Sequence, residues 1–438
     1  MIIPAAIDTH SPIFIRVTGA GTGGIAKLVL DGETVSACLT PCFTSRQPFN
    51  AAVAQDLLFG RLVDTSGAIV DEVVVAPVGK DRSETGNPQI ELSCHGGVGV
   101  LAGVEEVLVS AGIERGRPTE LLERAHLHNK LSLIAIEARL RLPEAATARQ
   151  ADFLLGFREF QRAWERCGFD LAMALRTSNR NWPETIRPAV ARAIPQCQTA
   201  RRLLAQHHVA ILGPVNAGKS TLANALARAE RHIVSEIPGT TLDRLDTPIE
   251  LHGLSLLLTD TAGLRKTGDE LESEGQQRAL RAAESAALRL LVVDGSQAPD
   301  LSCWPLCETS APSPLTPLPR GGEGDRSGSP MILVLNKRDL GIHDEAAGLE
   351  FALGCKAVAV SARSGEGLDE LSAASEEALL KGRSPEPGAP FTRRHAELLA
   401  QMQAELDAGS SGRDVLALLR RLVGMRPNAE ELARVMSE

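Results

Sequence analysis

The sequence predicts a multidomain protein of α/β and α+β class. We expect an N-terminal α+β domain followed by a helical domain, with a second α/β domain of mostly parallel sheet and flanking helices inserted into the helical one. Three observations support this prediction. The chain has 438 residues, too many for one hydrophobic core. The middle of the chain alternates short apolar runs with segments of helical periodicity. The sequence adjoining it on both sides has helical periodicity.

Residues 1–116 predict strands and turns, with β-rich runs at 13–17, 25–30 and 73–75 separated by glycines. The stretch GAGTGG at 19–24 matches the dinucleotide fingerprint GxGxxG. That motif must open a helix, whereas the following IAKLVLDG has the pattern of a strand ending in a turn. A glycine-rich hairpin in an N-terminal α+β domain is the preferred interpretation.

Two helical segments, 117–206 and 382–438, form the predicted helical domain. Both are rich in Leu, Ala, Glu and Arg, and apolar residues recur near helical spacing in the first segment at Leu121, Leu122, Ala125, Leu131, Ile134 and Ala138. Because the same composition and helical pattern return after GRSPEPGAP, the region between the two segments is predicted to be an insertion.

The inserted domain, 207–381, carries five candidate strands of a largely parallel sheet. They are 209–212, 254–259, 288–293, 331–335 and 357–360. Between the third and fourth, residues 299–330 are dominated by proline, glycine and serine, which predicts a disordered loop.

Charge and composition limit the function classes. The formal net charge of −9 disfavours a broad basic surface for nucleic acid, so any RNA contact should be local. Arginines concentrate between Arg139 and Arg202, where a solvated helix face is the preferred interpretation for most of them. No apolar run reaches the ~18 residues of a membrane span, and MIIPAAIDTH lacks the features of an export signal. We expect a cytoplasmic protein whose eight cysteines are free thiols.

The segment GPVNAGKS, Gly213 to Ser220, is the strongest motif. It fits GxxxxGK[ST] between a predicted strand and a predicted helix, the context that a phosphate-binding loop requires. Backbone N–H groups at a helix N-terminus and one ammonium group bind phosphate oxygens, and the hydroxyl can ligate Mg²⁺. The expected nucleotide contacts are Gly213, Asn216, Ala217, Gly218, Lys219, Ser220 and Thr221, with Ser220 on the metal.

Three further motifs follow predicted strands in order. DTAG begins with Asp260, expected to hold Mg²⁺, and ends with Gly263, whose amide can sense the γ-phosphate. NKRD supplies a carboxylate that accepts two hydrogen bonds from guanine, a donor pair that adenine lacks, and SAR supplies a backbone contact to the base. These base contacts are Asn336, Lys337, Asp339, Ser361, Ala362 and Arg363. Four motifs at the carboxyl ends of strands predict GTP binding.

The residue that orients the attacking water is not the usual one. Ras-like enzymes place a glutamine directly after DxxG, but here that position is Leu264. The segment 267–275 offers four carboxylates instead, Asp269, Glu270, Glu272 and Glu274. A solvated helix start is the preferred interpretation for three of the four. A bound monovalent cation could supply the charge of an arginine finger.

These motifs resemble the MnmE (TrmE) tRNA-modification GTPase family. The phosphate loop is similar to the family form GxPNxGKS, GTTLD at 239–243 to its GTTRD switch, and DTAGLR at 260–265 matches letter for letter. Segments 83–97 and 123–133 look like its folate-binding and helical domains. The resemblance implies catalytic roles for Lys219, Thr241 and Glu272, potassium binding by Asn216, Mg²⁺ binding by Thr241 and nucleotide contact by Thr240.

The resemblance also implies partners. Family members dimerise through the N-terminal domain, bind a tetrahydrofolate derivative, and act with an FAD-dependent partner, MnmG, on the wobble uridine of tRNA. This sequence departs from the pattern at Leu242, where the switch carries arginine, in its insertion, and in having no C-x-G-K motif and no cysteine after Cys355.

Three functional hypotheses remain. The first is a potassium-stimulated GTPase of tRNA modification whose hydrolysis is coupled to G-domain closure. The second is a regulatory relative that keeps the nucleotide switch without the modification chemistry. The third is a ribosome-assembly GTPase, which the acidic charge disfavours because such proteins usually add a basic RNA-binding module.

Overall fold

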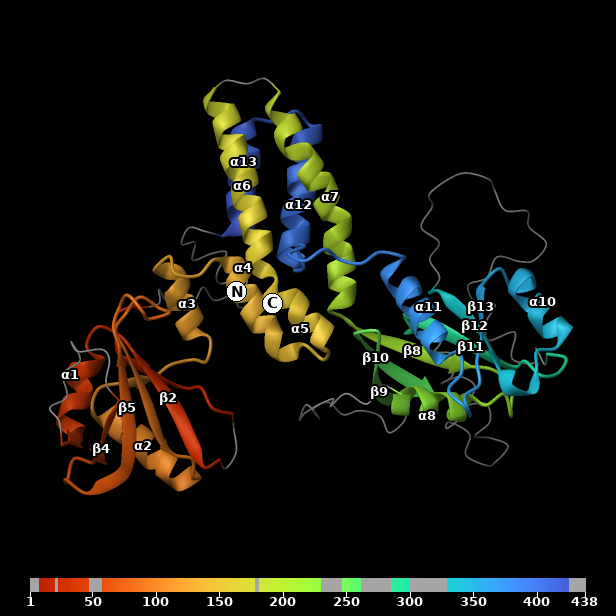
Figure 1. Cartoon of the computed structure of the whole chain (residues 1–438). Coiled ribbons are helices and arrows are strands. Elements are labelled where there is room, and N and C mark those ends of the chain that lie inside the picture. The colour runs from red at the N-terminus through yellow and green to blue at the C-terminus, as the bar shows by residue number, and fades with distance from the viewer. Residues whose placement is uncertain are drawn as a thin grey trace, which may run out of the picture. The chain divides into compact units, whose positions relative to one another are not determined.

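Figure 1 shows the computed structural model of the chain. The structure describes residues 8–19, 23–46, 57–177, 181–229, 246–260, 285–299 and 329–424. The chain divides into two compact units, each built from segments that are separate in sequence: one contains 1–139, 164–185 and 404–438, and the other 140–163 and 186–403. The predicted domain boundaries at 117, 207 and 382 differ from those of the units and stay predictions.

The first unit contains a seven-stranded sheet in the order β3-β4-β5-β6-β2-β1-β7. Neighbouring strands are antiparallel except β1 and β7, which are parallel. Burial alternates along β4, as expected for a sheet with one covered face. The strands are β1 (Ile13–Arg16), β2 (Ile25–Asp31), β3 (Phe43–Ser45), β4 (Leu58–Val63), β5 (Ile69–Val78), β6 (Gln89–His95) and β7 (Glu114–Arg115).

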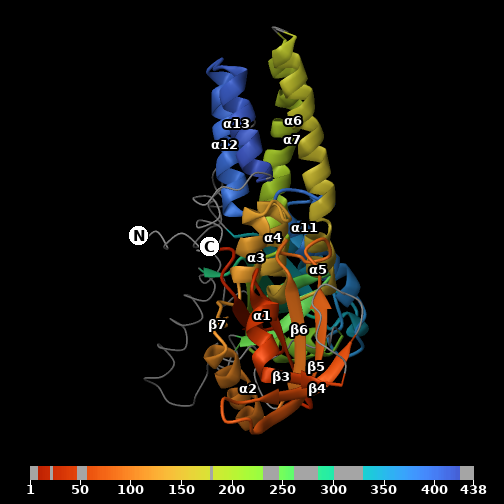
Figure 2. The ribbon, with the colours of Figure 1, turned by 90° about the vertical axis from the view of Figure 1, so that its left-hand side faces the viewer.

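Two helices complete the core of this sheet. Helices α1 (Val35–Leu39) and α2 (Val98–Ser110) share one apolar cluster with Phe14, Leu28 and Leu92. Figure 2 shows both helices beside the strands. Because β1 and β2 pair as an antiparallel hairpin and residues 25–31 form a strand, the dinucleotide fingerprint at 19–24 opens no helix, as the sequence predicts.

A buried ion pair lies at the end of β2. Asp31 and Arg124, which are 0% and 1% exposed, approach to 3.0 Å. The Asp31 carboxylate also accepts hydrogen bonds from the Thr85 hydroxyl and from the Asn87 and Gln89 amides. A buried charge is tolerated only when such partners satisfy it, so this network joins β2 and the 83–89 loop to α3 (Glu120–Leu127).

The predicted helical segments are helical in the structure. In the first unit α6 and α13 pack closely, since a Cβ at Gly168 would lie 2.9 Å from Leu419 and a Cβ at Gly412 would lie 2.4 Å from Leu175. Within the described ranges no helix is both long and apolar enough to cross a bilayer. The helices are α4 (Leu133–Arg141), α5 (Ala148–Leu155), α6 (Phe157–Arg176), α7 (Trp182–Leu203), α12 (Arg393–Asp407) and α13 (Gly412–Val423).

The second unit contains a six-stranded sheet in the order β13-β12-β11-β8-β10-β9. Every neighbouring pair is parallel except β9 and β10. Its strands are β8 (Gln206–Leu212), β9 (Asp246–Leu251), β10 (Leu254–Asp260), β11 (Leu288–Asp294), β12 (Met331–Asn336) and β13 (Lys356–Ala359), with helices α8 (Lys219–Ala229), α10 (Asp344–Leu353) and α11 (Leu368–Leu380). The predicted mostly parallel sheet is confirmed, and its antiparallel strand β9 was missed. Most of the predicted loop, residues 300–328, lies outside the described residues.

The turn between β9 and β10 is anchored to α5. Arg149 forms an ion pair with Glu376 of α11 at 2.6 Å and donates to the His252 carbonyl at 2.7 Å. The Thr147 hydroxyl donates to the Gly253 carbonyl at 2.7 Å. Burial acts to raise the pKa of Glu376, but hydrogen bonds from Arg149 and His252 outweigh it and hold that pKa below its ordinary value. These contacts fix the hairpin at its turn.

Candidate functional site

The predicted phosphate loop connects β8 to α8 and turns too tightly for side chains at two glycines. Gly213 has φ +144°, and a Cβ there would lie 2.0 Å from the Val292 carbonyl oxygen of β11. Gly218 has φ +90°, and its Cβ would lie 2.2 Å from the Asn336 amide nitrogen. Both positions therefore need glycine, because the backbone conformation and the close neighbours exclude a side chain.

Asn216 lies at the tip of this loop in the left-handed region, with φ 63°. Asparagine tolerates that conformation better than most residues, and the loop can close around it without a glycine. The adjacent Val215 side chain is exposed. Both residues of the tip are therefore exposed to solvent.

The ammonium group of Lys219 lies inside the loop. Its Nζ donates to the carbonyl oxygens of Gly213 at 2.9 Å and Pro214 at 2.7 Å, and the residue is only 8% exposed. Lys219 is also the first residue of α8, where the N–H groups of the first turn and the helix dipole favour an anion. A positive charge and a helix N-terminus therefore act on one small volume, which suits a phosphate group.

Asn336 joins three of the predicted motifs. Its side-chain amide donates to the Ala217 carbonyl at 2.8 Å, and its side-chain oxygen accepts from the Ala362 N–H at 3.0 Å. The residue is 2% exposed. One buried amide thus holds the phosphate loop, NKRD and SAR together at the carboxyl edge of the sheet.

Lys337 forms an ion pair that the sequence analysis did not anticipate. Its Nζ lies 2.6 Å from Asp294, the last residue of β11. Burial acts to raise the pKa of Asp294, while hydrogen bonds from Lys337 and Ser296 outweigh it and hold that pKa below the ordinary value. The signal for Asp294 was available, because it is a carboxylate at the end of a central parallel strand, where functional groups of such sheets collect.

The predicted base-reading residues lie in two adjacent loops. Asp339 is exposed, lies in the short 3₁₀ helix Arg338–Leu340, and accepts no hydrogen bond from any part of the chain that the structure describes. The Arg338 N–H donates to the Val360 carbonyl at 3.0 Å, which holds this helix beside the SAR loop. Ser361 is buried, and its own N–H and carbonyl bond to residues 366 and 365. Arg363 is exposed.

The structure brings together most of the predicted nucleotide contacts. Ser220 and Thr221 lie in the first turn of α8, next to Lys219. Asp260 ends β10, and its side chain is outside the description. The remaining predicted residues lie outside the described residues altogether: Thr240, Thr241, Gly263 and Glu272.

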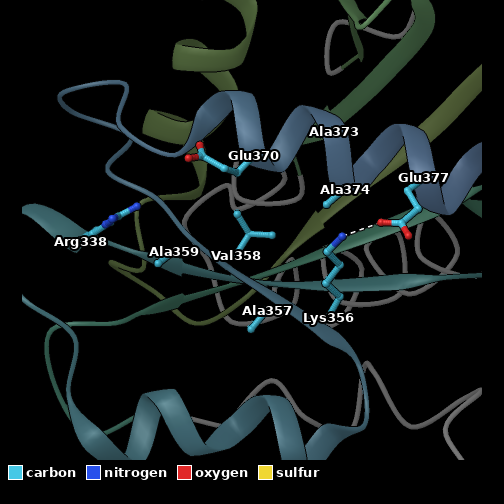
Figure 3. Close-up of a pocket in the computed structure, with 9 residues that line it drawn as sticks. All are labelled: Arg338, Lys356, Ala357, Val358, Ala359, Glu370, Ala373, Ala374 and Glu377. Carbon is cyan, nitrogen blue, oxygen red and sulfur yellow. Dashed lines mark hydrogen bonds and ion pairs between the residues drawn. The ribbon is translucent and has the colours of Figure 1, made fainter. Parts of the chain in front are cut away.

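A separate pocket of about 460 Å³ lies between α11 and β13 (Figure 3). Three of its four charged lining residues are already paired, Lys356 with Glu377 at 2.6 Å and Arg338 with Glu366 at 3.3 Å, and the fourth is the carboxylate Glu370. Apart from Arg338, none of the residues lining it belongs to the predicted motifs. Because helix N–H groups and Lys219 act at the phosphate loop instead, we place the nucleotide site there and not in this pocket.

The contact between Gly218 and Asn336 yields a prediction. We expect Gly218→Ala to weaken guanine-nucleotide binding by about tenfold or more, since backbone strain of roughly 1–3 kcal/mol adds to displacement of the Asn336 amide. Titration with a fluorescent GDP analogue measures this. Gly348→Ala in α10, where a Cβ meets open space, is the control and should bind normally. Equal affinity for both variants would contradict this account.

Comparison with known proteins places the chain in a family. Residues 208–337 match the family model described as "50S ribosome-binding GTPase", and residues 12–130 match "GTP-binding protein TrmE N-terminus". A tRNA modification GTPase MnmE of Thermus thermophilus is 34% identical over 98% of this chain and 94% of its own length, and that of Phenylobacterium zucineum is 33% identical over 90% and 88%.

Among solved structures, Aquifex aeolicus Era bound to GDP and AlF4⁻ is similar over 45% of this chain and 65% of its own, with 23% identity and a TM-score of 0.30. The relatives that share most of this chain carry the assignment. With a third of the residues identical along nearly the whole length and both family domains present, the chain belongs to the MnmE family of tRNA modification GTPases.

Proposed function

We propose that this chain binds GTP at the phosphate loop and hydrolyses it during modification of the wobble uridine of tRNA. The observation that carries the proposal is the buried Asn336 amide, which ties the phosphate-binding and base-reading motifs into one site. If these sequence motifs had arisen by chance, we would not expect one buried side chain to hydrogen-bond their loops to one another. Family membership adds the tRNA substrate.

Each residue of the site has a proposed role. Lys219 and the N–H groups of residues 213–221 bind the β- and γ-phosphates. Ser220, Asp260 and Thr241 would hold Mg²⁺, whose charge would stabilise the negative charge that develops on the phosphates. Asp339 accepts from the guanine ring, and Lys337, Ser361, Ala362 and Arg363 enclose the base.

Hydrolysis then needs an oriented water. The water oxygen bonds to the γ-phosphorus as the bond from that phosphorus to the bridging oxygen breaks, and the water's proton passes to a phosphate oxygen. Glu272 is the proposed orienting carboxylate, while Thr240, Thr241 and Gly263 contact the γ-phosphate side. Asn216 at the loop tip is the proposed potassium ligand, and domain closure completes the site.

The proposal extends to partners. A homodimer through the N-terminal domain is supported by apolar side chains that stay exposed there, Ile25 at 68% and Phe59 at 62%. Membership of the family supports a tetrahydrofolate derivative bound by that domain and an FAD-dependent, MnmG-like partner. The folate derivative would supply a one-carbon group and the flavin partner redox chemistry, neither of which the GTPase site provides.

Nucleotide specificity tests the role of Asp339. A carboxylate accepts from both guanine N1–H and the 2-amino group, whereas an amide supplies only one acceptor. We expect Asp339→Asn to weaken GTP binding by about 10- to 150-fold, the worth of a charged hydrogen bond, and to improve binding of XTP, whose 2-oxo group accepts from the amide. Asp369→Asn, the same charge change on α11, should leave both affinities unchanged. Unaltered preference in Asp339→Asn would refute the assignment.

Cation dependence tests the potassium site. We expect GTP turnover in KCl to exceed that in NaCl by about tenfold or more, because the cation replaces an arginine finger worth roughly 10³ to 10⁵ in rate. RbCl, whose cation is close to potassium in size, should support turnover nearly as well. Equal rates in the three salts would remove the cation mechanism.

Analysis of tRNA nucleosides tests the cellular role. Deleting the gene should remove C5 modification of wobble uridines, and the wild-type gene should restore it. A gene carrying Lys219→Ala should not restore the modification, because the protein then lacks the ammonium group that binds phosphate. Mass analysis of the nucleosides measures each outcome. Full modification in the deletion strain would leave the regulatory relative as the better hypothesis.

A further inference from the structure

All four arginines of α6 lie on one exposed face of that helix. The face also holds its two exposed large apolar side chains, Phe169 at 67% and Met173 at 44%. We call this set the α6 stripe, and its members are Arg158, Arg162, Arg166, Phe169, Met173 and Arg176. Successive members are four, four, three, four and three positions apart, which is the spacing of one helix face.

Helix geometry shows how narrow the stripe is. At ~100° per residue, its six members fall within an arc of about 80°. The buried side chains Phe160, Trp164 and Leu171 lie on the opposite side. At 1.5 Å rise per residue the stripe is ~27 Å long, with arginines 158, 162 and 166 about 6 Å apart. The three carboxylates of the helix, Glu159, Glu165 and Asp170, all lie outside the arc.

The side chains of the stripe arginines have no acidic partner in the part of the chain that the structure describes, as is also true of Arg192 and Arg201 on α7. Within the described residues, Arg162, Arg166 and Arg176 form no hydrogen bond or ion pair, and Arg158 contacts only the Phe157 ring, at 5.9 Å. By contrast, Arg139 pairs with Glu84 and Arg149 with Glu376. Four arginines with no ion-pair partner in the described residues thus gather on one face of a chain whose net charge is −9. Glu159 and Glu165 lie about 20° beyond the two edges of that arc.

We propose that the α6 stripe binds the RNA substrate, with its arginines on successive backbone phosphates and Phe169 stacked on an unpaired base. Planar guanidinium groups suit phosphate, and an exposed aromatic ring between cations suits a base of a single-stranded loop. This inference rests on the proposed role in tRNA modification and names the surface that the RNA uses. It satisfies the expectation that RNA contact in this acidic protein is local.

The composition of the stripe favours RNA over two other occupants. A membrane-bound helix separates its cationic face from its apolar face, whereas here they coincide. A stable protein interface buries about 800 Å² on each partner around an apolar centre, and two apolar side chains between arginines are too few for one. Charge complementarity with a polyanion remains the better match.

The test compares binding of one unmodified tRNA transcript, with a uridine at the wobble position, across a range of KCl concentrations. Arg162→Gln/Arg166→Gln should weaken binding by about tenfold or more at low salt. It should also reduce the slope of log K against log salt by about 1.4 to 1.8, the loss of two phosphate contacts. Arg192→Gln/Arg201→Gln removes the same charge from exposed positions on α7 and should change neither.

A second variant separates stacking from charge. Phe169→Leu keeps an apolar side chain but loses the ring, and should weaken binding by about 5- to 150-fold with an unchanged salt slope. GTP turnover without tRNA should be normal in all three variants, which shows that they are folded.

The outcomes separate this inference from the function on which it rests. A wild-type protein that binds no tRNA at any salt would overturn the tRNA role itself. Wild-type binding that the α6 variants retain, or that the α7 control loses equally, would overturn only the α6 assignment. Altered self-association in place of altered tRNA affinity would also overturn it, in favour of a protein interface.

Discussion

The site depends on one side-chain amide. Asn336 is the last residue of β12, and its two hydrogen bonds reach the loop after β8 and the loop after β13. Buried polar groups that lose a partner destabilise their surroundings, so each loop is held in place by the others. The glycine at 218 is part of the same constraint, because only a position without a Cβ leaves room for that amide.

The sequence predicted the sheet well because its central strands β11 and β12 are buried along nearly their whole length. Four of the six strands are mostly apolar, and their predicted ends fall within about a residue of those observed. It missed β9, whose sequence DTPIEL contains a proline and two carboxylates. An edge strand needs fewer apolar residues and tolerates proline, so composition gives little signal there. β8 also begins earlier than predicted, with the polar residues Gln206 to His208.

In the site, too, the sequence predicted the features that depend on local motifs and missed the contacts between residues distant in the chain. Motif spacing identified the phosphate loop and the residues after β12 and β13, since these depend on local backbone geometry. The ion pair of Asp294 with Lys337 joins residues 43 positions apart, and the bond of Asn336 to Ala217 joins residues 119 apart. No local pattern specifies such pairs. The sequence assigned Asn336 to the base alone, whereas the structure adds its role in holding three loops.

Strand register explains how residues distant in sequence reach one level of the sheet. Asp260 pairs with Ile211 in neighbouring parallel strands, two residues before Gly213 opens the phosphate loop. Asn336 pairs with Asp294 one strand further along. A shift of one residue would turn each side chain to the other face. The hairpin that carries Asp260 is also held at its turn by Arg149 and Thr147. The hairpin is therefore anchored at its turn, and the parallel pairing with β8 ends β10 at the level where the phosphate loop begins.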